Sequence, residues 1–143
     1  MIRRWSLGLV ALLGAASPAV ADGPVLPHLV AVLQGLDKIT ARTTVLRVHL
    51  GETVAFGTLR ITLRACLTTP PAEAPESAAF LEIAVEDPGR PTETAFSGWM
   101  FASSPSLSAL EHPVYDVWVI ECAEPLAEPE PPPSPPTTEG QNG

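Results

Sequence analysis

The feature that most constrains the fold of this chain is an alternation of apolar and polar side chains with a period of two. It is clearest from Leu59 to Ala65, where apolar residues alternate with Arg60, Thr62 and Arg64. Because successive side chains of a strand point to opposite faces, this segment is predicted to be a strand buried on one face. Further strands are predicted at residues 45–50, 54–56, 79–85, 96–101 and 114–120.

Two short helices are predicted beside these strands. One is the apolar run Leu29–Leu36. The other begins at Ser104-Pro105, a cap residue followed by a first-turn proline, and ends before Pro113. The predicted fold class is therefore mainly β, a small antiparallel β-sandwich or barrel with one or two short helices. Strand spacing alone leaves the choice between sandwich and barrel open.

Residues 1–21 have the pattern of a secretory signal peptide. Arg3 and Arg4 precede an apolar run, and Ala19-Val20-Ala21 provides the small-x-small motif for cleavage between Ala21 and Asp22. The alternative is an uncleaved membrane anchor. The apolar run is about 12 residues long, however, whereas a spanning helix needs about 20. A Sec-type signal and a periplasmic mature protein are therefore predicted.

The chain contains two cysteines, Cys66 and Cys122, and each lies at the end of a predicted strand. The two are too far apart in sequence for a CxxC motif, and an exported protein meets an oxidising environment. One structural disulfide is predicted. It would close a loop of about 57 residues and stabilise the fold by roughly 4 kcal/mol in the chain-entropy model.

The C-terminal segment, residues 123–143, differs in composition from the rest. It is rich in proline and glutamate, and it includes the run Pro131-Pro132-Pro133-Ser134-Pro135-Pro136. Such a composition predicts a disordered tail with polyproline II character. The predicted organisation is a signal peptide at 1–21, an N-terminal segment at 22–32, a single β-rich domain at 33–122 and the tail at 123–143.

Charge limits the classes of partner. Loss of Arg3 and Arg4 with the signal leaves 6 of the 8 Lys+Arg residues against 16 Asp+Glu, a net charge of −10. Such a chain would be repelled by the phosphates of nucleic acid or anionic lipid, so neither is an expected partner, and no stable membrane insertion is expected after cleavage. The histidines, His28, His49 and His112, show no metal-binding spacing, and no metal or cofactor is predicted.

Aromatic residues gather between residues 96 and 118, among serines, acids and a histidine. Rigid rings with polar neighbours suit a binding surface for another protein or a carbohydrate. The alternative is that these rings fill the core of the domain. The candidate binding residues are Trp99, Phe101, His112, Tyr115 and Asp116.

An enzyme can also be drawn from this region. His112 oriented by Asp116 could activate Ser103 or Ser104, and Glu111 with Asp116 could act as a carboxylate pair on a glycoside. No Gly-x-Ser-x-Gly motif accompanies these serines, and Ser104 is explained as a helix cap. We therefore predict a non-enzymatic binding or accessory domain for an envelope protein or complex. A small hydrolase acting on envelope polysaccharide is the alternative.

Several segments also resemble a known family, the domain of unknown function 2155. The resemblance is carried by residues 33–42 (LQGLDKITAR), 51–59 (GETVAFGTL), 64–66 (RAC), the long run 96–115 (FSGWMFASSPSLSALEHPVY) and the segment that follows it to Cys122. It implies a small exported protein of alphaproteobacteria. The family has no established activity, cofactor or catalytic residue, so the resemblance transfers no site.

Overall fold

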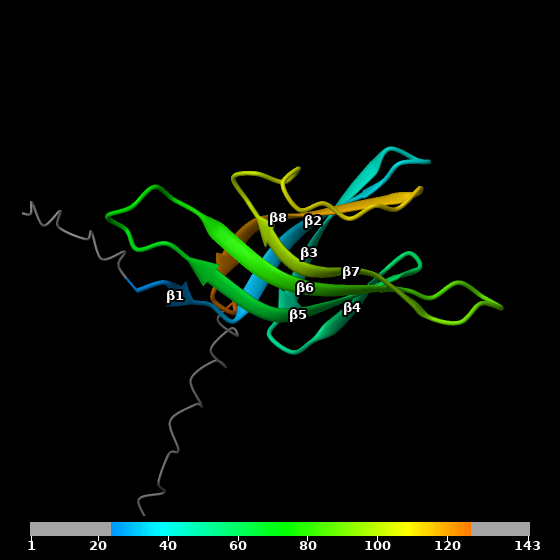
Figure 1. Ribbon diagram of the computed structural model, residues 1–143, viewed down its shortest axis with the longest axis horizontal. Helices are drawn as coiled ribbons and strands as arrows, with labels where there is room; N and C mark the ends of the chain where they lie inside the picture. Colours follow the sequence, from blue (N-terminus) through cyan, green and yellow to red (C-terminus); the bar gives the residue numbers. More distant parts are fainter. Residues whose placement is uncertain (1–23, 127–143) are drawn as a thin grey trace, which may run out of the picture.

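The computed structural model describes residues 24–126, and these form eight β-strands (Figure 1). Their bounds, in chain order, are β1 Leu26–Pro27, β2 Val30–Asp37, β3 Arg42–His49, β4 Thr53–Phe56, β5 Leu59–Thr68, β6 Ser77–Val85, β7 Glu93–Phe101 and β8 Tyr115–Ala123.

The strands form two antiparallel sheets. Sheet A has the order β1-β5-β6-β7, and β4 pairs with the same strand β5. Sheet B has the order β3-β2-β8. In Figure 1, the green strands β5 and β6 and the yellow-green strand β7 lie across the strands of sheet B. The two sheets share one core, so each buries one face against the other.

The alternation in the sequence determines which side chains enter this core. Leu59, Ile61 and Leu63 of β5 are fully buried, and so are Leu81 and Ile83, which face them from β6. Sheet B contributes buried residues from all three of its strands, namely Ala31, Leu33, Val48, Val117 and Val119. No polar or charged residue is buried among the described residues.

The predicted disulfide is confirmed. Cys66 of β5 and Cys122 of β8 are bonded, with their Cα atoms 5.6 Å apart, and the bond therefore joins sheet A to sheet B. Both cysteines lie in the core, and the backbone N–H of Cys122 donates to the Ser77 hydroxyl. The cross-link holds together one end of the two-sheet structure.

The mainly β, antiparallel prediction is confirmed, but both predicted helices are wrong. No helix forms between residues 24 and 126. The segment Leu29–Leu36 falls largely in β2, the central strand of sheet B, whose burial from Val30 to Leu33 on both faces gives a continuous apolar run. The segment after Ser104 contains turns, with Leu107 N–H donating to Ser104 C=O, because it has no apolar stripe to stabilise a helix.

The two sheets do not close into a barrel within the described range. Apart from the disulfide, the backbone link between the sheet edges is one isolated bridge, Leu50–Leu63, and not a continuous ladder. The predicted signal peptide at 1–21, its cleavage site and the tail from residue 127 onward lie outside the described residues. In residues 24–126 there is no helix of the length and hydrophobicity needed to span a membrane.

Candidate functional site

The outer face of sheet A, the face turned away from the core, carries the most distinctive surface. Met100 of β7 points into the core, so its neighbours Trp99 and Phe101 point outward. On β6, buried Ala79 and Leu81 alternate with the outward-facing Ala78 and Phe80. Strand pairing places Phe80 opposite Trp99 and Ala78 opposite Phe101. Four apolar side chains are thus adjacent on a face that solvent can reach.

Three of them, Ala78, Trp99 and Phe101, border a shallow groove of about 340 Å³, which we call the Trp99 groove. Its walls are largely apolar, and the ring of Phe80 contacts Trp99 edge-on with centroids 5.5 Å apart. The groove is lined by Val25, Leu67, Thr68, Thr69, Glu76, Ala78, Trp99 and Phe101.

The other half of the same face is polar. Arg64 pairs with Glu82 across β5 and β6, and Arg60 pairs with Glu86 at 2.9 Å. The solvated face of an antiparallel sheet is ordinarily polar throughout. The apolar surface is therefore confined to one end of sheet A, the end that carries the disulfide.

Glu76 is the one ionisable residue that lines the groove, and its carboxylate is already bound. It accepts hydrogen bonds from the Ser103 hydroxyl, from Ser103 N–H and from Ser77 N–H. Burial alone would raise the pKa of Glu76, but these hydrogen bonds favour the charged form and lower the pKa below its ordinary value. Ser103, proposed above as a nucleophile, instead holds this carboxylate.

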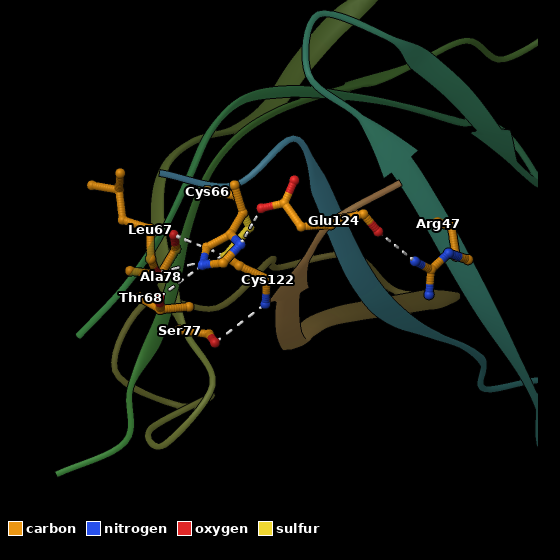
Figure 2. Close-up of polar contacts among 9 residues, drawn as sticks. Arg47, Cys66, Leu67, Thr68, Ser77, Ala78, Cys122 and Glu124 are labelled. Carbon is orange, nitrogen blue, oxygen red and sulfur yellow. Dashed lines mark hydrogen bonds and ion pairs between the residues drawn. A yellow bond between two sulfur atoms is a disulfide. The ribbon is translucent and has the colours of Figure 1, made fainter. Parts of the chain in front are cut away.

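A histidine that sequence reasoning did not select connects the groove to the end of β8. His28 Nδ1 lies 2.8 Å from Glu124 Oε1, and its Nε2 lies 2.8 Å from Thr68 Oγ1 (Figure 2). The backbone N–H of His28 also donates to Cys66 C=O. We call this three-residue set the His28 clamp. Its partners lie 40 and 96 residues away in sequence, so no local pattern could have shown it.

The remaining candidates form a second cluster. His112 stacks on Tyr115 with centroids 5.3 Å apart, and Tyr115 contacts Phe56 edge-on. His112 Nδ1 accepts hydrogen bonds from the N–H groups of Val114 and Tyr115. An accepting Nδ1 places the ring proton of neutral His112 on Nε2. This nitrogen therefore organises a turn.

Asp116 interacts with a lysine. Its Oδ1 lies 3.4 Å from Lys38 Nζ, and the same ammonium donates to the His112 carbonyl oxygen. Asp116, His112 and Ser103, which the sequence suggested as members of a catalytic triad, therefore each contact other groups. In the described part of the chain, no group of three or more His, Cys, Asp or Glu side chains gathers as metal ligands would.

The five predicted binding residues thus fall in two places. Trp99 and Phe101 line the Trp99 groove near the end of β7. His112 borders a separate hollow beside Glu93, where β7 begins. Glu93 and Trp99 are separated by about 20 Å at about 3.4 Å per strand residue. Tyr115 and Asp116 belong to the His112 cluster. Phe96 and Tyr115 are half-buried against the core, while Trp118 is half-buried in β8.

Comparison with known proteins places the chain in a family. Residues 31–122 match the model described as "Uncharacterized protein conserved in bacteria (DUF2155)". The chain belongs to this family. The matched range starts within β2 and ends at Cys122, so it includes the disulfide, Trp99 and Phe101 but not His28 or Glu124.

A curated relative adds no assigned role. An uncharacterized protein of Rickettsia prowazekii (strain Madrid E) is 31% identical over 87 residues, covering 61% of this chain. The match spans 56% of that protein's own length. No solved structure matches this DUF2155 chain significantly.

Proposed function

We propose that this chain is a non-enzymatic binding domain of the periplasm that docks another envelope protein in the Trp99 groove. The observation that carries the proposal is the apolar end of the outer face of sheet A, where the half-buried Trp99 and Phe101 lie on the strand beside Ala78, and Leu67 follows on the next strand. Large aromatic side chains on a solvent face supply the anchors of most protein interfaces.

The contrast within one sheet supports this proposal. The same face carries Arg60, Arg64 and Glu82 at its other end, in ion pairs typical of a solvated surface. An apolar region bounded by such polar residues is characteristic of an interaction site. The core itself is complete without Trp99 and Phe101, because Met100 fills the inward position between them.

The compartment is argued from chemistry. Residues 1–21 have the composition of a signal peptide, and the chain's two cysteines are joined in a bond that persists in oxidising environments. Fusion of alkaline phosphatase after residue 126 tests the export directly, since the phosphatase is active only when its own disulfides form. An inactive fusion that accumulates to normal levels would refute the periplasmic assignment.

The binding proposal is tested in the native host. Tagged wild-type protein, Trp99→Ala and Ser97→Ala are isolated from the envelope fraction, and co-purifying proteins are quantified by mass spectrometry. Ser97 lies on the same strand and is exposed, but it does not line the groove, so it is the matched control. One protein should be depleted at least about ten-fold by Trp99→Ala alone, because a central aromatic anchor contributes roughly 2 kcal/mol or more. Equal recovery with all three would refute the proposal.

Hydrolysis is a second candidate function with one observation in its favour. The His28 clamp places a hydroxyl, an imidazole and a carboxylate in the order used for nucleophilic catalysis, from Thr68 through His28 to Glu124. A hydroxyl nucleophile attacks acyl groups, so the fitting substrate is an ester, such as an acylated envelope polysaccharide. The hydrolytic function would be established if the wild type and Thr68→Ser release acetate from O-acetylated polysaccharide and Thr68→Ala does not. Equal, background-level release by all three proteins would exclude it.

A further inference from the structure

The polar groups of the Trp99 groove are already occupied. Thr68 Oγ1 contacts His28, and Thr69 Oγ1 donates to Ala74 C=O while accepting from Glu76 N–H. The Glu76 carboxylate is held by Ser77 and Ser103. The groove therefore offers an occupant apolar contact but few free hydrogen-bonding side chains. An occupant that brings many backbone N–H groups would leave them without partners, which is costly.

A proline-rich segment meets this condition. Proline has no N–H group, and a polyproline II helix has no internal hydrogen bonds and keeps its carbonyl groups in water. Such segments bind grooves lined by aromatic side chains because their conformation is largely fixed before binding. Trp99, Phe101 and Phe80 supply the aromatic surface here.

The chain itself contains such a segment, a few residues beyond the described range. Residues 131–136 read PPPSPP and carry no charge. The described chain ends at Leu126, two residues after Glu124. Glu124 contacts His28, and His28 contacts Thr68, a residue of the groove wall. The His28 clamp therefore holds Glu124, at the start of the C-terminal segment, close to Thr68 of the groove wall.

The width of the groove can be compared with the length of the residues that lead to the proline-rich segment. Leu67, Ala78 and Phe101 lie in one row on β5, β6 and β7, and two strand spacings of about 4.8 Å make this row about 10 Å wide. Residues 127–130 span about 12 Å at about 3.1 Å per residue when extended as polyproline II. Four extended residues therefore exceed the width of this row.

We infer that residues 131–136 occupy the Trp99 groove of their own chain and compete there with the partner. This inference rests on the proposed function of the groove, and it adds the chemical class of the partner, an extended proline-rich segment. A short tether gives an effective concentration on the order of 1 mM. If the free peptide binds with a Kd of about 0.1 mM, the tethered segment fills the groove about 90% of the time and weakens an external peptide about ten-fold.

The test uses the mature chain (22–143), a chain ending at residue 126, and a synthetic peptide of residues 125–143. Isothermal calorimetry should show the peptide binding the shortened chain about ten-fold more tightly than the full chain. Trp99→Ala in the shortened chain should abolish binding, and so should Phe101→Ala, a second variant that removes the other aromatic side chain of the groove lining. A peptide with Pro131, Pro132, Pro133, Pro135 and Pro136 replaced by alanine is the matched control and should not bind.

A spectroscopic measurement tests the contact within the intact chain. With Trp118→Phe, Trp99 is the single tryptophan of the mature protein. Removal of residues 127–143 should then raise acrylamide quenching of its fluorescence. Three results would each overturn the inference. They are unchanged quenching, equal peptide affinity for both chains, and a dimer that is lost on truncation, which would mean that the segment binds a second copy of the chain. The proposed function has its own readout, the Trp99-dependent partner recovered from the envelope. It stands if only the peptide experiments fail.

Discussion

Replacing both Cys66 and Cys122 by alanine should lower the free energy of unfolding by about 4 kcal/mol. The bond joins residues separated by 56 positions, and the chain-entropy model assigns about 4 kcal/mol to a loop of this length. Because it crosses from β5 to β8, the bond is also the one covalent link between the two sheets apart from the main chain within the described range. A domain of this size has a total stability of roughly 5–15 kcal/mol, so the loss is a large fraction of it.

Urea denaturation followed by far-UV circular dichroism measures this loss. The melting temperature should fall in parallel by about 20 °C, since 1 kcal/mol corresponds to roughly 4–8 °C for a domain of this size. Wild-type protein reduced with dithiothreitol is the matched control, because it keeps the volume of both sulfur atoms. The reduced protein should lose most of the same stability, and the alanine variant should lose slightly more. An unchanged midpoint in both would refute the reasoning.

Three further perturbations probe other contacts. Gly57→Ala should destabilise the fold by about 1–3 kcal/mol, because its Cβ would overlap the Tyr115 ring, whereas Gly51→Ala, also at positive φ but in open space, should cost only about 1 kcal/mol. Glu76→Gln should remove a stabilisation that the wild type has at neutral pH. Since the folded pKa of Glu76 is lowered, this difference should shrink as the pH falls below 4.5, the ordinary value. His28→Ala should cost about 1 kcal/mol through its two hydrogen bonds.

Each of these has a control or a contradicting result measured by the same denaturation. Equal losses for Gly57→Ala and Gly51→Ala would show that contact with Tyr115 contributes nothing. A Glu76→Gln difference that stays constant from pH 7 to pH 3 would contradict the lowered pKa. His49→Ala, which removes a side chain 55% exposed and paired with Glu52, should change stability by less than about 0.5 kcal/mol. If His49→Ala lost as much stability as His28→Ala, the two hydrogen bonds of His28 would contribute no more than the exposed pair of His49 and Glu52.

Much of the fold follows from local pattern. Ile61 and Leu63 enter the core while Arg60 and Arg64 stay outside, as a period of two requires. The disulfide followed from two cysteines and a predicted signal peptide, which implies an oxidising compartment. The pattern failed at residues 29–36, because a strand buried on both faces has the same apolar run as a buried helix. It failed after Ser104 because a cap contributes only about 1 kcal/mol, which is too little for a short segment without a buried apolar face.

The site was less accessible from sequence. Trp99 and His112 are close in the chain, yet His112 lies in the segment after β7 and beside Glu93, near the opposite end of β7 from Trp99. The groove depends on Leu67 and Ala78, small or ordinary residues on neighbouring strands that no motif distinguishes. The His28 clamp depends on pairs separated by 40 and 96 residues. Both are products of strand pairing and so require the three-dimensional structure.

The central claim is that the protein binds its partner through the Trp99 groove. Photo-crosslinking in intact cells tests it most directly, with a photoreactive phenylalanine analogue replacing Ala78 in the groove or Thr62 on the polar half of the same face. Irradiation should give one adduct of defined mass from position 78, and this adduct should be lost when Trp99→Ala is added. Position 62 should give none. Identical adducts from both positions, or none from position 78 in folded, exported protein, would contradict the claim.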